Sequence, residues 1–183
     1  MKKIIIFLVI ILILVGSLYA IVKTIFPLKH DYYIELYSKE YDIDPYLVAG
    51  VIKAESNFEQ TAVSSKNATG LMQITESTAK WIADKLDIDD FNYQTDITSA
   101  KNNIQMGCFY IDYLLDMYSG DTECALAAYN AGFGNVNKWL ADSAYSKDGE
   151  TLDVIPFPET EDYVKRVMNY QKIYNWLYKD LKD

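Results

Sequence analysis

Residues 96–118 read DITSAKNNIQMGCFYIDYLLDMY and predict a long helix at the centre of the fold. We expect this helix to begin at Asp96, because aspartate is a favoured N-cap residue. Small or apolar residues recur every three or four positions and form one helix face over about six turns. These residues are Ile97, Ala100, Ile104, Gly107, Cys108, Ile111, Leu114, Leu115 and Tyr118.

The rest of the chain beyond residue 30 also has helical spacing, and no segment alternates as a strand would. Asp44 precedes a proline at a first helical position, and Thr75 precedes another expected helix. The sequence therefore predicts a mainly α domain. The expected helices are 31–39, 45–56, 76–86, 122–131, 136–142 and 161–181, the last capped by Thr160, with loops at 59–70 and 145–158.

The N-terminus has a different composition from the rest of the chain. Residues 4–22 carry no charge and are flanked by lysines, and a bilayer-spanning helix needs about 20 such residues. A cleaved secretory signal is the alternative, but Leu18 or Val15 would occupy a position that favours a small residue. We therefore expect an uncleaved single-pass anchor in the cell membrane. The preceding lysine pair favours a cytoplasmic N-terminus and an extracytoplasmic domain.

Two parts are expected: an anchor with a short linker at residues 1–30, and one globular domain at residues 31–183. All 26 acidic residues but only 13 of the 17 basic residues lie in the second part, which gives it a net charge of −13. A domain this acidic repels a phosphate backbone, so no nucleic-acid partner is expected. The sequence identifies no protein partner.

Several kinds of chemistry are excluded by the residues that the domain lacks. The only histidine is His30, at the edge of the predicted anchor. Serine and cysteine nucleophiles normally need a partnered base, and two cysteines cannot complete a zinc site. We therefore expect no metal and no cofactor. Acid–base catalysis by a carboxyl group is the chemistry that these residues leave open.

Glu55 is an unusually placed carboxylate. Val48, Val51, Ile52 and Glu55 are spaced i, i+3, i+4 and i+7, so Glu55 shares the apolar face of its helix. It also lies in the last turn, at the negative end of the helix dipole. Desolvation and the dipole both favour the protonated form, as a general acid requires. The alternative is a glutamate that reaches into water from the helix end.

Five short motifs occur in an order and at spacings that match a known family. They are ESNF at 55–58, GLMQI at 70–74, NIQMGCFYI at 103–111, ALAAYNAG at 125–132 and ETEDYV at 159–164. Residues 41–178 thus resemble the soluble-type lytic transglycosylase domain of the goose-lysozyme-like group. Two positions depart from the family pattern: Asn67 stands where glycine is usual, and Glu76 where proline is common.

The resemblance implies a lysozyme-like fold and an enzyme that acts on bacterial peptidoglycan. Such enzymes cleave the bond between N-acetylmuramic acid and N-acetylglucosamine and form a 1,6-anhydro sugar. By the same resemblance, Glu55 is the single general acid and base. Glu59 and Glu76 receive no nucleophilic role and are interpreted as solvated surface residues.

The resemblance assigns substrate-binding roles to three residues of the loop region. Ser64 corresponds to a serine that contacts the muramyl N-acetyl group, and Met72 and Gln73 correspond to residues that line the cleft. Each also has a purely structural interpretation. Ser64 is a common turn former, and Met72 suits a core position.

The second half of the domain supplies the remaining predicted site residues. Tyr129 and Asn130 match the motif that faces Glu55, and Glu159 with Tyr163 matches the motif that closes the far wall. The structural alternatives are a core position for Tyr129, a helix C-terminal residue for Asn130 and a helix cap for Glu159.

Two alternative functions compete with lytic transglycosylation. One is a hydrolytic muramidase that uses water on the same fold. The other is a non-catalytic peptidoglycan-binding module that has kept the cleft. A binding module has no need of a buried acid, so Glu55 favours an enzyme.

Overall fold

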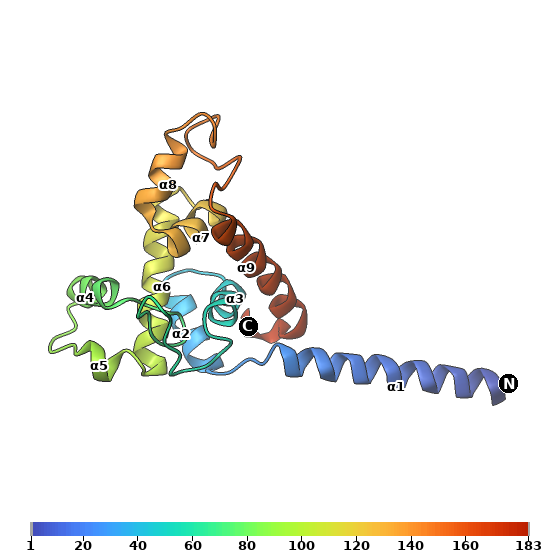
Figure 1. Cartoon of the computed structure of the whole chain (residues 1–183). Coiled ribbons are helices and arrows are strands. Elements are labelled where there is room, and N and C mark those ends of the chain that lie inside the picture. The colour runs from blue at the N-terminus through green and yellow to red at the C-terminus, as the bar shows by residue number, and fades with distance from the viewer. Residues whose placement is uncertain (1, 183) are drawn as a thin grey trace.

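The computed structural model describes residues 2–182 and is mainly helical (Figure 1). Within that range the only β-type pairing consists of two isolated bridges, Val63 with Thr69 and Thr69 with Ile74. The helices are α1 (Lys2–Ile25), α2 (Asp31–Glu40), α3 (Pro45–Glu55), α4 (Glu76–Lys85), α5 (Tyr93–Asp96), α6 (Ala100–Met117), α7 (Thr122–Ala131), α8 (Phe133–Leu140) and α9 (Pro158–Leu177), followed by the 3₁₀ helix η1 (Lys179–Lys182).

Local capping signals in the sequence explain several helix ends. The Asp44 carboxylate accepts the Tyr46 N–H at 3.0 Å, and the Thr75 hydroxyl accepts the Thr78 N–H at 3.3 Å. Gly132, with a φ of 84°, ends α7 and precedes α8. The predicted starts of α3 and α4 are therefore confirmed.

Two predicted caps are wrong. Helix α6 begins at Ala100 and not at Asp96, because the Asp96 carboxylate accepts the Asn92 N–H and the Thr95 hydroxyl within the separate helix α5. Helix α9 begins at Pro158, so Thr160 lies inside its first turn. The Thr160 hydroxyl donates instead to Asn130 Oδ1 at 2.8 Å.

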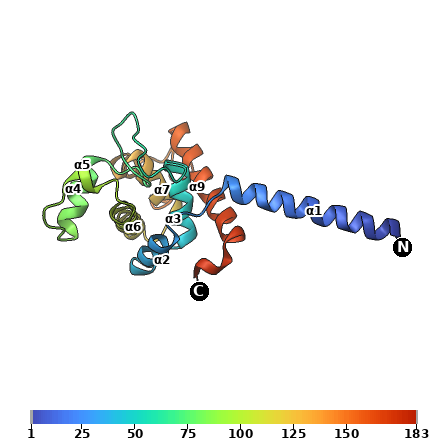
Figure 2. The ribbon, with the colours of Figure 1, turned by 90° about the horizontal axis from the view of Figure 1, so that it is seen from below.

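Helix α6 is the centre of the domain. It packs against α2, α4 and α7, and Figure 2 shows it along its axis with these helices around it. Helices α3 and α9 lie side by side and make the most extensive helix pair. Gly50 allows this approach, because a Cβ there would lie 3.0 Å from the Val167 carbonyl oxygen.

Helix α1 projects away from the domain in both views (Figures 1 and 2). None of its described residues is buried, and its mean hydropathy of 3.2 makes it the one described helix long and apolar enough to cross a membrane. The chain between α1 and α2 is held against α9. The Tyr178 hydroxyl donates to the Phe26 carbonyl at 2.8 Å, and the Tyr174 hydroxyl to the Pro27 carbonyl at 3.1 Å.

Candidate active site

Glu55 is the last residue of α3, and its surroundings are those that the helix spacing predicts. Val48, Val51 and Ile52 on the same face are fully buried, while Glu55 itself is only partly exposed. Burial raises the pKa of the Glu55 carboxyl from 4.5 to about 7. A carboxyl with this pKa is substantially protonated near neutral pH and can donate a proton.

Two groups of α9 act against this effect of burial. The Tyr163 hydroxyl and the Arg166 guanidinium both lower the pKa of Glu55, although less than burial raises it. Arg166 lies over the Tyr163 ring, 5.9 Å from its centroid. The Tyr163 hydroxyl is buried and makes no hydrogen bond of ordinary geometry, so it remains a donor beside Glu55. Glu55 thus has groups nearby that favour each of its two protonation states.

Tyr129, near the end of α7, joins the same cluster. Its hydroxyl donates to the Met72 carbonyl at 2.7 Å, and its ring lies 5.4 Å from that of Tyr110. Burial, followed by the charge of Glu55, raises the pKa of Tyr129 well above its ordinary value. The structure therefore brings Glu55, Tyr129 and Tyr163 together from three helices.

Met72 contributes to the site through its main chain. Its side chain is fully buried, and a Cβ at Gly107 would lie 2.1 Å from the Met72 sulfur. The Met72 N–H donates to Asn103 Oδ1 at 2.7 Å, and Asn103 Nδ2 donates to the carbonyls of Thr69 and Ile97. The Met72 side chain thus occupies a core position, which was the structural alternative to a place in the cleft. Asn103, which the sequence analysis missed, holds this part of the chain in place.

Ser64 and Gln73 organise the loop that leads from α3 to α4. Ser64 Oγ accepts the Ala68 N–H at 3.1 Å, which is the turn-forming role. Gln73 has a φ of 49°, and its Nε2 donates to the carbonyls of Ala62 and Gly70. Ser56, immediately after Glu55, donates to the Leu71 carbonyl at 2.7 Å and ties this loop to the end of α3.

Asn130 and Glu159 have different surroundings. Asn130 Oδ1 accepts the Thr160 hydroxyl, which fixes the end of α7 to the start of α9. Glu159 lies in the first turn of α9 with its side chain exposed, and the N-cap position is Phe157. The structure records no contact between Glu159 and Glu55 among the described residues.

The other carboxylates considered from the sequence lie at the surface. Glu59 is exposed and accepts the Thr61 hydroxyl at 2.9 Å. Glu76 is exposed and pairs with Lys80 at 2.7 Å. These contacts confirm the interpretation of both as surface residues. Across residues 2–182, no group of three or more histidine, cysteine or acidic side chains is placed to hold a metal ion.

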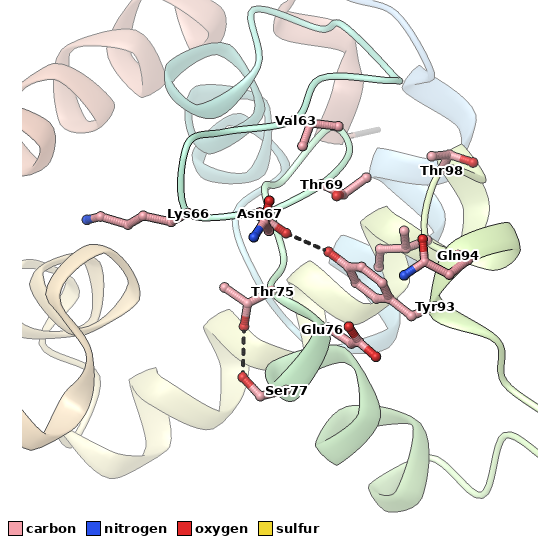
Figure 3. A pocket seen from close by; sticks show the side chains of 11 residues that line it. Val63, Lys66, Asn67, Thr69, Thr75, Glu76, Ser77, Tyr93, Gln94 and Thr98 are labelled. Atoms are coloured by element: carbon pink, nitrogen blue, oxygen red, sulfur yellow. Dashed lines mark hydrogen bonds between the residues drawn. The ribbon is translucent and has the colours of Figure 1, made fainter.

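Two hollows lie near the loop and α4. The first, of about 630 Å³, is lined mainly by residues with polar side chains, including Thr75, Glu76 and Tyr93, and Glu55 does not line it. Figure 3 shows the Lys66 side chain pointing away from the others there, while the Tyr93 hydroxyl donates to the Asn67 carbonyl at 3.0 Å.

The second hollow is lined mainly by aromatic residues. It has a volume of about 280 Å³ and is lined by Ser77, Thr78, Trp81, Tyr110, Tyr113 and Phe133. Tyr110 contacts both Tyr129 and Trp81, with ring centroids 5.4 and 6.2 Å apart. Ring contacts thus connect Tyr129, beside Glu55, through Tyr110 to Trp81.

Comparison with known proteins gives a consistent result. The family model described as "Transglycosylase SLT domain" matches residues 32–152. The soluble lytic murein transglycosylase of Salmonella typhimurium is 32% identical over 160 residues, which are 87% of this chain and 25% of that protein. The membrane-bound lytic murein transglycosylase C of Actinobacillus pleuropneumoniae serotype 5b is 36% identical over 111 residues, which are 55% of this chain and 30% of that protein.

Solved structures agree with the sequence relatives. An inactive mutant of the lytic transglycosylase Slt from Pseudomonas aeruginosa has a TM-score of 0.74 at 32% identity and covers 82% of this chain and 24% of that one. The 70-kDa soluble lytic transglycosylase of Escherichia coli has a TM-score of 0.77 at 27% identity and covers 91% and 27%. The expected lytic transglycosylase fold is confirmed. The chain spans about a quarter of the length of the soluble relatives that it matches.

Proposed function

Since this chain belongs to the transglycosylase SLT domain family, we propose that it is a peptidoglycan lytic transglycosylase. The substrate is the bond between N-acetylmuramic acid and N-acetylglucosamine. The observation that carries the proposal is the raised pKa of Glu55 in a site whose other identified groups are Tyr129, Tyr163 and Arg166. None of these is a second carboxylate, so they support a mechanism with one catalytic acid.

The first step breaks the glycosidic bond. Protonated Glu55 donates its proton to the glycosidic oxygen, and the N-acetylglucosamine unit leaves with a new hydroxyl group. The muramyl anomeric carbon becomes oxocarbenium-like, as in other glycosidic cleavages. Glu55 is then a carboxylate. Arg166 and the Tyr163 hydroxyl both favour that form.

The second step closes the anhydro ring. The Glu55 carboxylate takes the proton of the muramyl 6-hydroxyl while that oxygen bonds to the anomeric carbon. Glu55 is again protonated, and no water is consumed. An acceptor within the same sugar gains the high effective molarity of a held reactant. A hydrolase would instead need a carboxylate placed to activate water or to act as the nucleophile.

The remaining predicted residues position the substrate. By family resemblance, we assign the muramyl N-acetyl contact to Ser64, and Gln73 holds the loop that presents it. Tyr129 and Asn130 form the wall that faces Glu55. Glu159 and Tyr163 belong to the opposite wall. Met72 acts through its carbonyl, which accepts the Tyr129 hydroxyl.

The aromatic hollow around Trp81 extends this surface for a longer ligand. The faces of aromatic rings suit the apolar faces of sugar rings. We propose that a glycan strand bound at Glu55 continues over Tyr110 towards Trp81 and Tyr113. The edge-on ring contact between Trp81 and Tyr113, 4.9 Å between centroids, supports a rigid platform there.

We also propose that α1 remains on the protein as a single-pass anchor in the cell membrane, with the domain outside the cytoplasm. The exposed apolar surface of α1 and the membrane-bound relative support this location. N-terminal sequencing of the mature protein tests it. A mature N-terminus between Gly16 and Ile21 would identify a cleaved signal.

Mass spectrometry of products from purified peptidoglycan in oxygen-18 water tests the activity. We expect 1,6-anhydro-N-acetylmuramyl ends without the heavy isotope, and no products from Glu55→Gln. The matched control Glu59→Gln alters an exposed glutamate and should give the parent's products. Reducing ends that carry oxygen-18 would show a muramidase. Binding without products would show a non-catalytic module.

A further inference from the structure

The stretch from Tyr163 to Lys179, which covers most of α9 and the first residue of η1, is basic within an acidic domain. From Tyr163 to Lys179 the chain carries four basic residues, of which Lys165 pairs with Glu161, and no acidic residue, although residues 31–183 have a net charge of −13. Lys172 and Trp176 are exposed and lie at i and i+4, which places them on one face of α9, and the exposed Lys179 begins η1 directly after the C-cap of that helix. We call these three residues the basic face.

The basic face lies beside the end of α1. The rings of Tyr19 and Trp176 meet edge to face with centroids 5.8 Å apart. Lys23 Nζ lies 4.9 Å from the centroid of the Tyr178 ring and 5.3 Å from that of Tyr19. Tryptophan and tyrosine with nearby lysine are typical of the membrane–water interface. Trp176 is 56% exposed, so part of its ring is available to a membrane surface.

The linker after α1 is fixed to the same part of α9. Besides the bonds of Tyr174 and Tyr178 to the linker carbonyls, the Phe26 ring meets that of Tyr170 edge to face at 5.4 Å. Lys53 of α3 donates to the Ile25 carbonyl at 2.5 Å. These contacts join α1 and the linker to the domain at several points, so the linker is not a flexible connection.

The orientation of the elements places α9 towards the membrane. In both views α9 forms the side of the domain from which α1 projects (Figures 1 and 2). When α1 spans a bilayer, that side of the domain meets the lipid headgroups. Positive charge on an otherwise acidic domain is complementary to anionic lipid headgroups in the leaflet that the domain faces.

We propose that the basic face of α9 and η1, with Tyr19 and Lys23 of α1, binds the headgroups of an anionic phospholipid bilayer. The domain is thereby held in one orientation on the membrane. This inference rests on the proposed anchoring by α1 and not on the proposed catalysis.

Spin labels on the full chain in vesicles test the orientation. One label is attached through Asn169→Cys, at an exposed position of α9 one turn before Lys172. The matched control label is attached through Lys138→Cys, at an exposed position of α8. The native Cys108 and Cys124 are buried and should stay unlabelled. Vesicles contain phosphatidylcholine with or without phosphatidylglycerol, plus a trace of a lipid whose headgroup carries chelated nickel.

We expect nickel to relax the label at position 169 at least threefold more than the label at 138 in anionic vesicles. Lys172→Gln with Lys179→Gln should reduce this ratio, whereas the control pair Lys85→Gln with Lys101→Gln should not. Equal relaxation at the two positions would show a loosely tethered domain and overturn the proposal. A ratio unchanged without phosphatidylglycerol would overturn the role of anionic lipid.

Flotation of the same samples separates the two proposals. Protein that floats with vesicles but shows equal relaxation has a membrane anchor without the proposed orientation. Protein that does not float lacks the anchor, which overturns both. Activity on soluble glycan fragments, measured in parallel, reports on catalysis independently of either result.

Discussion

The end of α3 and the stretch that runs from the following loop to the start of α4 are two regions whose glutamates have very different surroundings. Glu55 is covered by α7 and α9, and burial raises its pKa to about 7. Glu59, four residues later, is exposed and accepts the hydroxyl of its neighbour Thr61. Glu76 is exposed and paired with Lys80. Position in the fold, and not residue type, therefore decides which carboxyl is suited to acid catalysis.

The two regions also differ in how their backbones are built. Helix α3 is regular and its buried face is continuous, so Glu55 is held by packing. The loop instead passes through left-handed conformations at Asn57, Asn67 and Gln73 and is held by side-chain bonds such as those of Gln73. The rigid element presents the acid, and the loop supplies polar contacts.

The sharpest test of this comparison is Glu55→Gln. We expect peptidoglycan cleavage to fall by at least about 10²-fold, because the amide cannot transfer the proton. Glu59→Gln and Glu76→Gln should stay within about twofold of the parent. Chromatography of released muropeptides measures the activity, and circular dichroism checks the fold. Residual activity of Glu55→Gln within tenfold of the parent would remove Glu55 from its role.

Stability should distinguish the same carboxyls. The folded pKa of Glu55 lies above its ordinary value, so the folded state binds more protons than the unfolded state between about pH 4.5 and 7. Stability is therefore lost as the pH rises through that range. Glu55→Gln should be more stable than the parent at pH 8, by roughly 1–3 kcal/mol, and should lose this advantage at pH 4.

Urea unfolding of parent and variant at both pH values measures the effect. Glu59→Gln serves as the control, with no advantage expected at pH 8. An advantage of Glu55→Gln that is equal at pH 4 and pH 8 would contradict a buried titrating carboxyl.

Tyr163→Phe should change the pH dependence of peptidoglycan cleavage more than its maximal rate. The hydroxyl lowers the pKa of Glu55, so its removal raises that pKa and moves the alkaline limb of the activity profile to higher pH. The rate at the optimum should change less than about tenfold, as expected for one hydrogen bond. Tyr32→Phe, at an exposed residue of α2, is the control. A shift to lower pH would assign the tyrosine another role.

The smallest expected effect is at the surface ion pair. Glu76→Gln should change the free energy of unfolding by no more than about 0.5 kcal/mol, because exposed pairs contribute little. Thermal unfolding at low and high salt measures it. A larger change in the free energy of unfolding, present at both salt concentrations, would contradict a solvent-exposed role for Glu76.

The sequence predicts what depends on neighbours along the chain. The cap at Asp44 and the spacing of Val48, Val51 and Ile52 place Glu55 correctly, because helix periodicity is a local property. The cap expected at Asp96 is wrong, since a competing local turn uses that carboxylate. Thr160 bonds to Asn130, thirty positions away in the chain, and periodicity carries no information about such a partner.

The missed site residues depend on tertiary contacts. Arg166 lowers the pKa of Glu55 only because α9 packs along α3. Its position one turn after Tyr163 could have indicated from the sequence that both residues share a helix face. Asn103 interrupts the apolar stripe of α6 between Ala100 and Gly107. A polar residue on such a face indicates a buried hydrogen-bonding role, but its partners Met72 and Thr69 come from another part of the chain.

The close approach of α3 and α9 at Gly50 affects how the protein is made. Helices α4 to α8 separate these two along the chain, so their pairing forms only after α9 has been synthesised. Contacts between distant segments must also overcome the entropy of closing the intervening loop. A nascent chain that ends before Tyr163 has neither the cover over Glu55 nor its α9 partners. The proposed peptidoglycan-cleaving activity would thus arise only after α9 has been synthesised.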